Sequence, residues 1–159
     1  MIISNYKTYC MKTIFNLDDK NDIINRIDQL HPDSKPMWGK MSVSQMLAHC
    51  IVPTKVSTGD IPGKQNIFGI LFGKIAKKRM VSEEPFKKNL PTDPSFVVKH
   101  DPDFYESQQE LKTLIEKLYN TDKNELVQRK HPFFGKLTTD EWGLLNYKHF
   151  DHHLRQFGV

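Results

Sequence analysis

Four segments of the chain repeat apolar residues at the spacing of an α-helix, and this pattern limits the fold more than any other feature. The clearest lies in residues 104–118, where Leu111, Leu114, Ile115 and Leu118 recur three or four positions apart. Residues at this spacing share one helical face, which must pack against another element to leave water. The other segments are residues 16–31, 42–58 and 138–157. The pattern predicts four main helices packed together.

Helix-start signals support three of these boundaries. Ser42 with Gln45, and Thr138 with Glu141, have the spacing of a capping box, in which each side chain bonds the other residue's backbone N–H. Asp101 is a candidate N-cap for the third main helix. We therefore expect helices to begin near residues 42, 101 and 138.

The segments between the main helices differ in character. Pro53 lies inside the second helical pattern and predicts a kink or a break there. Residues 66–80 favour a short amphipathic helix, and residues 81–103, with four prolines, favour an extended loop. Loops of this length often border a site. No strand signal is comparably strong, so the sequence predicts an all-α four-helix bundle with a long irregular connection between the second and third main helices.

Length and charge bound the class of protein. The 159 residues fit one domain, which we place at residues 15–159 after a poorly anchored tail, residues 1–14. The net charge of +4 is too small and too dispersed to indicate a nucleic-acid partner. No apolar run approaches the ~20 residues of a membrane span. We see no signal peptide, and two cysteines without motif spacing favour a cytoplasmic protein. Met11 is an alternative start.

Three of the seven histidines fall within five residues near the C-terminus: His149, His152 and His153. His149 and His153 are four residues apart, so both project from one helical face. A single histidine on a helix usually packs or makes one hydrogen bond. Two on one face are a known way to hold a transition metal, provided that another element supplies a third ligand. His49, at the edge of the second helix's apolar stripe, is the candidate.

Four other residues are candidates for the surroundings of such a site. His152 lies about 100° around the helix from its neighbours and is interpreted as a packing residue or a partner of the ligands. Gln156, one turn beyond His153, could orient a ligand. Trp142 could line a pocket, although packing in the core explains it more simply. His131 either lines a pocket mouth or packs and caps locally.

Related metal motifs are absent from the sequence. A zincin requires Glu directly after the first histidine, and here that residue is Phe150. A di-iron bundle requires Glu-x-x-His on two helices, and neither copy is present. Cys50 follows His49 directly, so it points elsewhere and is interpreted as a buried, inert thiol.

Three stretches resemble a known family: "HPFFGKLTTDEWGLLNYKHFDHHLRQFG", "MSVSQMLAHC" and "PFKKNLPTD". They are similar to DUF1569, an uncharacterised bacterial family of the DinB/YfiT-like superfamily, over nearly the whole chain from about Phe15. The resemblance implies a four-helix bundle with up-down-down-up connectivity. It also implies a nickel or zinc ion held by one histidine of the second helix and an HxxxH pair of the fourth. Those positions here are His49, His149 and His153.

The resemblance also implies a chemistry, because related branches include thiol-dependent S-transferases and a mycothiol-dependent maleylpyruvate isomerase. Our leading hypothesis is a metal-dependent enzyme that activates a low-molecular-weight thiol for transfer to an electrophilic small-molecule substrate. A metal-dependent hydrolase is the alternative, since a three-histidine site leaves a position open for water. The sequence identifies no general base and leaves open whether the protein forms a homodimer.

A second class of function is a non-catalytic interaction protein. The segment "FGILFGKIAKKRM" joins an apolar part to a cluster of cations, which are Lys74, Lys77, Lys78 and Arg79. That composition can dock on an anionic membrane or a protein partner. The simpler interpretation is a helix packed on the bundle with a solvated basic end.

Overall fold

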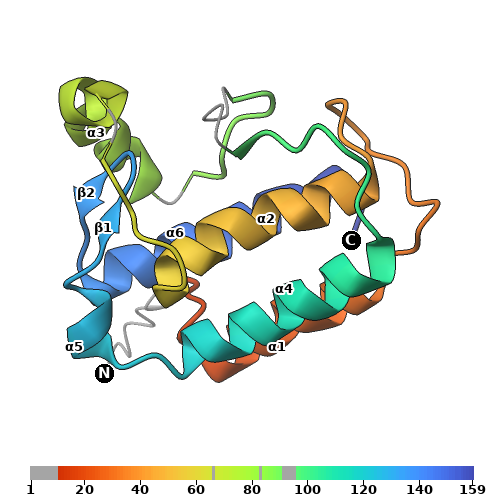
Figure 1. Cartoon of the computed structure of the whole chain (residues 1–159), viewed down its shortest axis with the longest axis horizontal. Coiled ribbons are helices and arrows are strands. Elements are labelled where there is room, and N and C mark those ends of the chain that lie inside the picture. The colour runs from red at the N-terminus through yellow and green to blue at the C-terminus, as the bar shows by residue number, and fades with distance from the viewer. Residues whose placement is uncertain (1–10, 66, 83, 91–95) are drawn as a thin grey trace, which may run out of the picture.

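The computed structural model describes residues 11–65, 67–82, 84–90 and 96–159. Over these residues the chain is mainly helical, with six helices and one two-stranded antiparallel sheet (Figure 1). The helices are α1 (Leu17–Asp28), α2 (Val43–Thr58), α3 (Ile67–Met80), α4 (Phe104–Tyr119), α5 (Lys123–Leu126) and α6 (Thr139–Gln156). The strands are β1 (Lys130–His131) and β2 (Gly135–Lys136).

Four helices, α1, α2, α4 and α6, enclose the core. α2 packs along α4 and against α6, and α1 packs against the same two helices (Figure 1). Their apolar stripes meet inside, as the periodicity predicted. The largest fully buried side chains of these helices are Ile23, Ile27, Met46, Leu47, Leu111, Ile115, Leu118, Trp142 and Phe150. The mainly helical class is confirmed.

Both predicted capping boxes are present. Ser42 Oγ accepts from the Gln45 backbone N–H, and Gln45 Oε1 accepts from that of Ser42, both at 3.1 Å. Thr138 and Glu141 exchange the same pair of bonds, at 2.8 and 3.2 Å. These bonds satisfy backbone donors that have no partner within the helix. They fix the residues at which α2 and α6 begin, and hence the helical turn on which each histidine lies.

One local prediction is wrong, and at a second position one of two predicted alternatives is excluded. α4 is capped by Asp103, whose carboxylate accepts from Glu106 N at 2.8 Å, and not by Asp101. Asp101 instead accepts from Ser42 Oγ at 3.0 Å, which ties the loop before α4 to the start of α2. The predicted break at Pro53 is also absent, because α2 runs through it from Val43 to Thr58.

Side chains add hydrogen bonds to the turns next to Pro53. Pro53 has no N–H to give to the carbonyl of His49, one turn earlier. In the next positions Thr54 Oγ1 donates to the Cys50 carbonyl at 2.7 Å, and Ser57 Oγ donates to the Pro53 carbonyl at 3.0 Å. The helix therefore continues, and His49 stays on a regular turn facing α6.

The predicted tail, residues 1–14, lies mostly outside the described residues. Of the part described, Ile14 is fully buried, and its N–H donates to the Gly143 carbonyl at 3.2 Å. Thr13 N donates to the Asp19 carboxylate at 3.0 Å. The packed unit thus includes at least these two residues, and the boundary at residue 15 stays a prediction.

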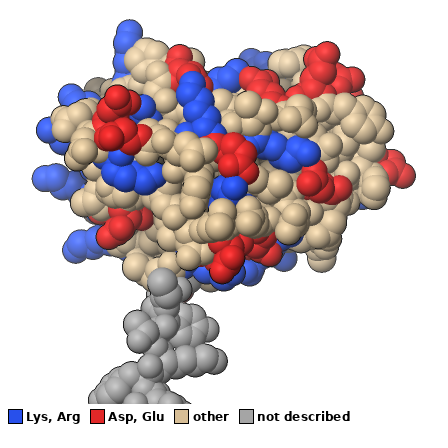
Figure 2. Space-filling view, turned by 90° about the horizontal axis from the view of Figure 1, so that it is seen from below, with Lys and Arg blue, Asp and Glu red and all other residues tan. Residues whose placement is uncertain are grey.

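Ion pairs join α1 to α4 on the outer face of the molecule. Lys20 pairs with Glu116 and Lys112 pairs with Asp28, both at 2.6 Å. In Figure 2, which views the molecule from below, positive and negative side chains are interspersed across the surface. This face carries mixed charge and no broad area of one sign.

α3 stands apart from these four helices, beside a β-hairpin that was not predicted from the sequence (Figure 1). The residues predicted as a loop, 120–137, contain α5 and the β1–β2 hairpin. Gly69 and Gly73 bring α3 close to the hairpin turn: a methyl group on Gly69 would lie 2.5 Å from the Phe133 carbonyl oxygen. The helix at residues 67–80 is confirmed. None of the helices among the described residues is long and apolar enough to cross a membrane.

Candidate metal centre

Three histidine rings meet where α2 faces α6. His49 comes from α2, and His149 and His153 come from successive turns of α6. One ring nitrogen of each lies within 4.8 Å of the other two. The ring centroids are 4.7 to 5.2 Å apart. The structure therefore brings together the three residues selected from sequence, in a group that could hold a metal ion.

The spacing of the ring nitrogens suits coordination. Nε2 of His49 and Nε2 of His149 are 3.2 Å apart. Two nitrogens bound to one tetrahedral zinc at about 2.05 Å lie about 3.4 Å from each other. The two nitrogens therefore have nearly the separation that a shared ion requires.

Hydrogen bonds to the other ring nitrogens set the tautomers. Nδ1 of His49 is 3.0 Å from the carbonyl oxygen of Phe96. A carbonyl only accepts, so His49 Nδ1 carries the proton and Nε2 keeps a free electron pair. Nδ1 of His153 is likewise 2.9 Å from Oε1 of Gln156. In both rings the free pair is on the nitrogen available to a metal.

Gln156 connects His153 to the loop before α2. Its Nε2 donates to the Trp38 carbonyl at 2.7 Å. This bond fixes the amide orientation, because only the NH₂ group can donate to a carbonyl, and so Oε1 must face His153. Gly39, at φ +82°, permits the approach: a methyl group there would lie 2.5 Å from Gln156 Nε2. The predicted orienting position of Gln156 thus has a specific set of bonds.

Burial keeps the three imidazoles neutral. It is the main cause that lowers the pKa of His49, of His149 and of His153, the last to about 3. The neighbouring histidines lower the pKa of His149 and His153 further, since positive charges placed together repel. Neutral imidazole is the form that binds metals. No protons would have to leave these rings before an ion binds at neutral pH.

The donor set fits a borderline transition metal better than a hard cation. Among the described residues the group consists of imidazole nitrogens alone, whereas calcium and magnesium require oxygen ligands. Three protein ligands leave a further coordination position for a small molecule, as in catalytic sites.

His152 lies beside the three histidines but faces another way. Its ring centroid is 5.1 Å from that of His153, 5.8 Å from Trp38 and 6.1 Å from Phe86. It lines a cavity of about 120 Å³, together with the cationic side chains of Lys88, Lys148 and Arg155. Burial lowers the pKa of His152. The structure places it among aromatic side chains at the edge of the site.

Trp142 and His131 pack together below the site. Trp142 is fully buried, and its ring centroid is 5.7 Å from that of His131. His131 Nδ1 accepts from the backbone N–H of Phe133 and of Phe134, at 3.0 and 3.2 Å, so it holds the hairpin turn closed. Trp142 Nε1 is buried with no hydrogen-bond partner among the described residues. For Trp142 the simpler interpretation was packing in the core, and for His131 it was local packing and capping. Both match the positions of these residues.

Cys50 follows the candidate ligand His49 in sequence, but its side chain is not part of the group of candidate ligands. Its side chain is 1% exposed and contacts Met46 Sδ. Burial raises the pKa of the thiol, so it remains protonated. The buried position of the thiol is confirmed, and a protonated thiol is consistent with its interpretation as inert.

Sequence analysis missed the backbone groups of the site. The backbone carbonyls of Phe96 and Trp38 orient the site. Every residue has a backbone carbonyl, so the residue type does not indicate which one takes part. Two signals nonetheless pointed to these segments: the long loop 81–103, which supplies Phe86 and Phe96, and Gly39 in the loop before α2. A loop expected to border a site does so here.

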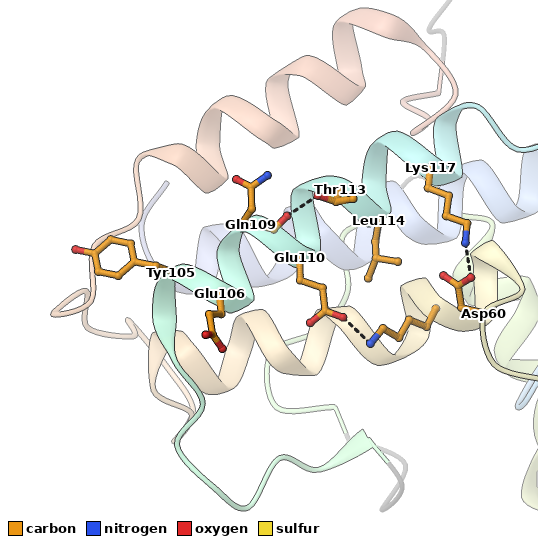
Figure 3. A pocket seen from close by; sticks show the side chains of 9 residues that line it. Asp60, Tyr105, Glu106, Gln109, Glu110, Thr113, Leu114 and Lys117 are labelled. Atoms are coloured by element: carbon orange, nitrogen blue, oxygen red, sulfur yellow. Dashed lines mark hydrogen bonds and ion pairs between the residues drawn. The ribbon is translucent and has the colours of Figure 1, made fainter.

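A wider hollow lies elsewhere, between α2 and α4. It is an open groove of about 820 Å³ (Figure 3). Four of its five charged side chains are paired across it, Lys55 with Glu110 at 2.5 Å and Lys117 with Asp60, and the fifth is Glu106. None of the three converging histidines lines it. The groove offers little unsatisfied chemistry, and we assign no site to it.

Fold and site together define a mainly helical protein with a three-histidine candidate metal centre. The chain belongs to the family described as a protein of unknown function, DUF1569, whose model matches residues 11–158. The match covers all three histidines and the segments that orient them. Comparison with curated proteins and with solved structures finds no match.

Proposed function

We propose that His49, His149 and His153 bind one divalent transition metal ion, nickel or zinc, in a four-helix bundle of the DinB/YfiT-like type with up-down-down-up connectivity. The observation that supports the proposal best is the convergence of three ring nitrogens, from two helices, within 4.8 Å. The bonds from His49 to Phe96 and from His153 to Gln156 add to it, because they leave the correct nitrogen free on each ring.

We further propose that the protein is an enzyme that transfers a low-molecular-weight thiol to an electrophilic small molecule. A divalent ion at the site would lower the pKa of a thiol or water molecule in its open position. In the transfer the thiol loses its proton, and its sulfur forms a bond to the electrophilic carbon. In a substitution, a leaving group departs with the electrons of its bond. When the thiol instead adds across a double bond, the neighbouring carbon takes up a proton.

The residues around the site have positioning roles in this proposal. Phe96 and Gln156 hold two rings in the orientation that a metal requires, as partners of metal-bound histidines usually do. The buried surroundings keep all three rings neutral. The aromatic side chains of Trp38 and Phe86, beside His152, limit the access of water from one side.

Elemental analysis of protein purified without a histidine tag tests the metal assignment. We expect about one nickel or zinc per chain in the wild type and almost none in His149→Ala, with the helical circular dichroism spectrum retained. His31→Ala is the matched control, since His31 is exposed and outside the group. Stoichiometric metal in His149→Ala would refute the ligand assignment.

A thiol and electrophile panel then separates transfer from hydrolysis. The three neutral ligands also suit hydrolysis, because they leave the full charge of the ion to acidify a water molecule. Transfer requires turnover that depends on an added thiol and is lost in His149→Ala. Turnover of esters or amides without thiol, lost in the same variant, identifies a hydrolase instead.

A further inference from the structure

α3 exposes a face on which large apolar side chains surround two lysines. Four large aliphatic side chains of this helix are exposed to between 64% and 73%: Ile67, Ile70, Leu71 and Ile75. Phe72, beside them, is 53% exposed. Ile67, Leu71 and Ile75 recur every four residues and therefore form one row along the helix. Contiguous apolar surface of this kind commonly marks an interaction site.

The seat of α3 explains why this face is turned outward. Gly69 and Gly73 lie on the opposite side of the helix, against the backbone of the hairpin turn at Phe133. Met80, at the end of the helix, is 2% exposed. The side with the smallest residues is thus the one in contact with the protein. The side with the largest apolar residues faces away from it.

The same helix carries cations and no acids. Lys74, Lys78 and Arg79 are exposed, and Lys77 pairs with Glu141 at 2.8 Å. Counting about 100° per residue, Lys74 and Lys78 lie on the apolar face, between Ile70 and Leu71. Long lysine side chains can extend from such a position toward charged groups while their stems stay in apolar surroundings. The exposed face is therefore apolar and positively charged at once.

We propose that α3 docks on the surface of an anionic lipid bilayer, with its aliphatic row among the acyl chains and Lys74 and Lys78 at the headgroups. Interfacial helices combine these two features. A second copy of the chain fits less well, because pairing two α3 faces would bring lysines of like charge together. The row of aliphatic side chains runs along the helix axis, so the whole length of α3 can lie on a flat surface. This surface function is independent of the metal proposed above.

Sedimentation with lipid vesicles tests the proposal on the full chain. We expect binding to vesicles of equal parts phosphatidylcholine and phosphatidylserine, and weak binding to phosphatidylcholine alone. Lys74→Gln with Lys78→Gln should lower the partition coefficient about 25-fold, about fivefold for each charge. Leu71→Asp with Ile75→Asp should abolish binding. Since these side chains are exposed, both variants should keep the wild-type helical spectrum.

Tyr105→Asp is the matched control, because Tyr105 is 67% exposed but lies on α4. It should bind vesicles like the wild type. His149→Ala should also bind normally, which separates this proposal from the metal assignment. Equal binding to neutral and anionic vesicles, or no binding, would overturn it. So would a dimer in sedimentation velocity that Ile75→Asp dissolves, which would identify a second copy as the occupant.

Discussion

The three-histidine centre and α3 invert the usual relation between polarity and burial. At the centre, polar side chains are buried and hydrogen-bonded: Gln156 is 3% exposed and His153 is 8% exposed. On α3, aliphatic side chains are in solvent, with Ile75 73% exposed. Burying a polar group without partners costs about 1–3 kcal/mol, so a buried polar cluster needs a complete set of bonds. An exposed row of apolar side chains has little effect on the free energy of unfolding. Its presence on α3 therefore needs an explanation other than the stability of the fold.

The two regions also differ in how they are held. The centre lies between α2 and α6, which contribute to the main core on both sides of it. α3 contacts the hairpin through its glycines and reaches the core with Met80. Changes near the centre should therefore affect the stability of the whole protein. Changes on the outer face of α3 should leave that stability untouched.

Among single substitutions, the largest effect is expected from Phe150→Ala, next to His149 on α6. Phe150 is 2% exposed, and removing a buried phenyl group costs about 3–5 kcal/mol through lost transfer free energy and the cavity left behind. Urea denaturation of chelator-treated protein measures the change without a contribution from metal. A loss below about 1 kcal/mol would mean that this end of the packed helices is loosely packed.

Among changes of condition, acid should destabilise the metal-free protein most strongly. The pKa of each of His49, His149 and His153 is lower in the folded than in the unfolded state, where it is near 6.5. Below that pH these histidines are protonated in the unfolded chain but remain neutral in the folded chain. Stability is therefore complete above about pH 6.5 and falls below it, by up to about 1.4 kcal/mol per pH unit for each histidine that stays neutral.

For His153 the fall should continue toward pH 3, where its folded-state pKa lies. Thermal or urea denaturation between pH 7 and pH 4, in the presence of a chelator, measures the slope. His153→Gln removes one titrating group and should give a shallower slope. An unchanged slope in this variant would show that His153 does not remain neutral in the fold.

A smaller effect is expected from Gln156→Ala. The variant removes the bond to His153 Nδ1 and the link to the Trp38 carbonyl, so the ring loses its fixed orientation. Loss of such a partner commonly weakens metal binding about 10–100-fold. Competition with a chromophoric chelator measures the affinity, with His31→Ala as the control. Unchanged affinity would mean that the packing of α6 alone orients His153.

The difference between the two regions also explains what the sequence could predict. The helical period and the capping boxes identified α2 and α6, and the same period placed His149 and His153 on one face. The pairing with His49 required a tertiary contact, which local pattern can suggest but not establish. The carbonyls of Phe96 and Trp38 were not predictable, since their positions depend on the paths of two loops.

The orientation of α3 was not predictable for a different reason. Its apolar residues favoured packing on the bundle, because periodicity reports which residues share a face and not what that face meets. The decisive residues, Gly69 and Gly73, act by lacking side chains, and the surface that they contact is a hairpin that gave no strand signal. Two short strands of two residues each are too brief for an alternating pattern to emerge.

The smallest effect is expected from Ile75→Ala on α3. Its side chain is 73% exposed, and alanine has a slightly higher helix propensity than isoleucine, so the free energy of unfolding should change by less than about 0.5 kcal/mol. Urea denaturation under the conditions used for Phe150→Ala gives a direct comparison. A loss above about 1 kcal/mol would mean that this face is covered in solution, by a second copy or by another part of the chain. A neutral result means that folding does not require isoleucine there, which leaves binding as the reason for an apolar residue.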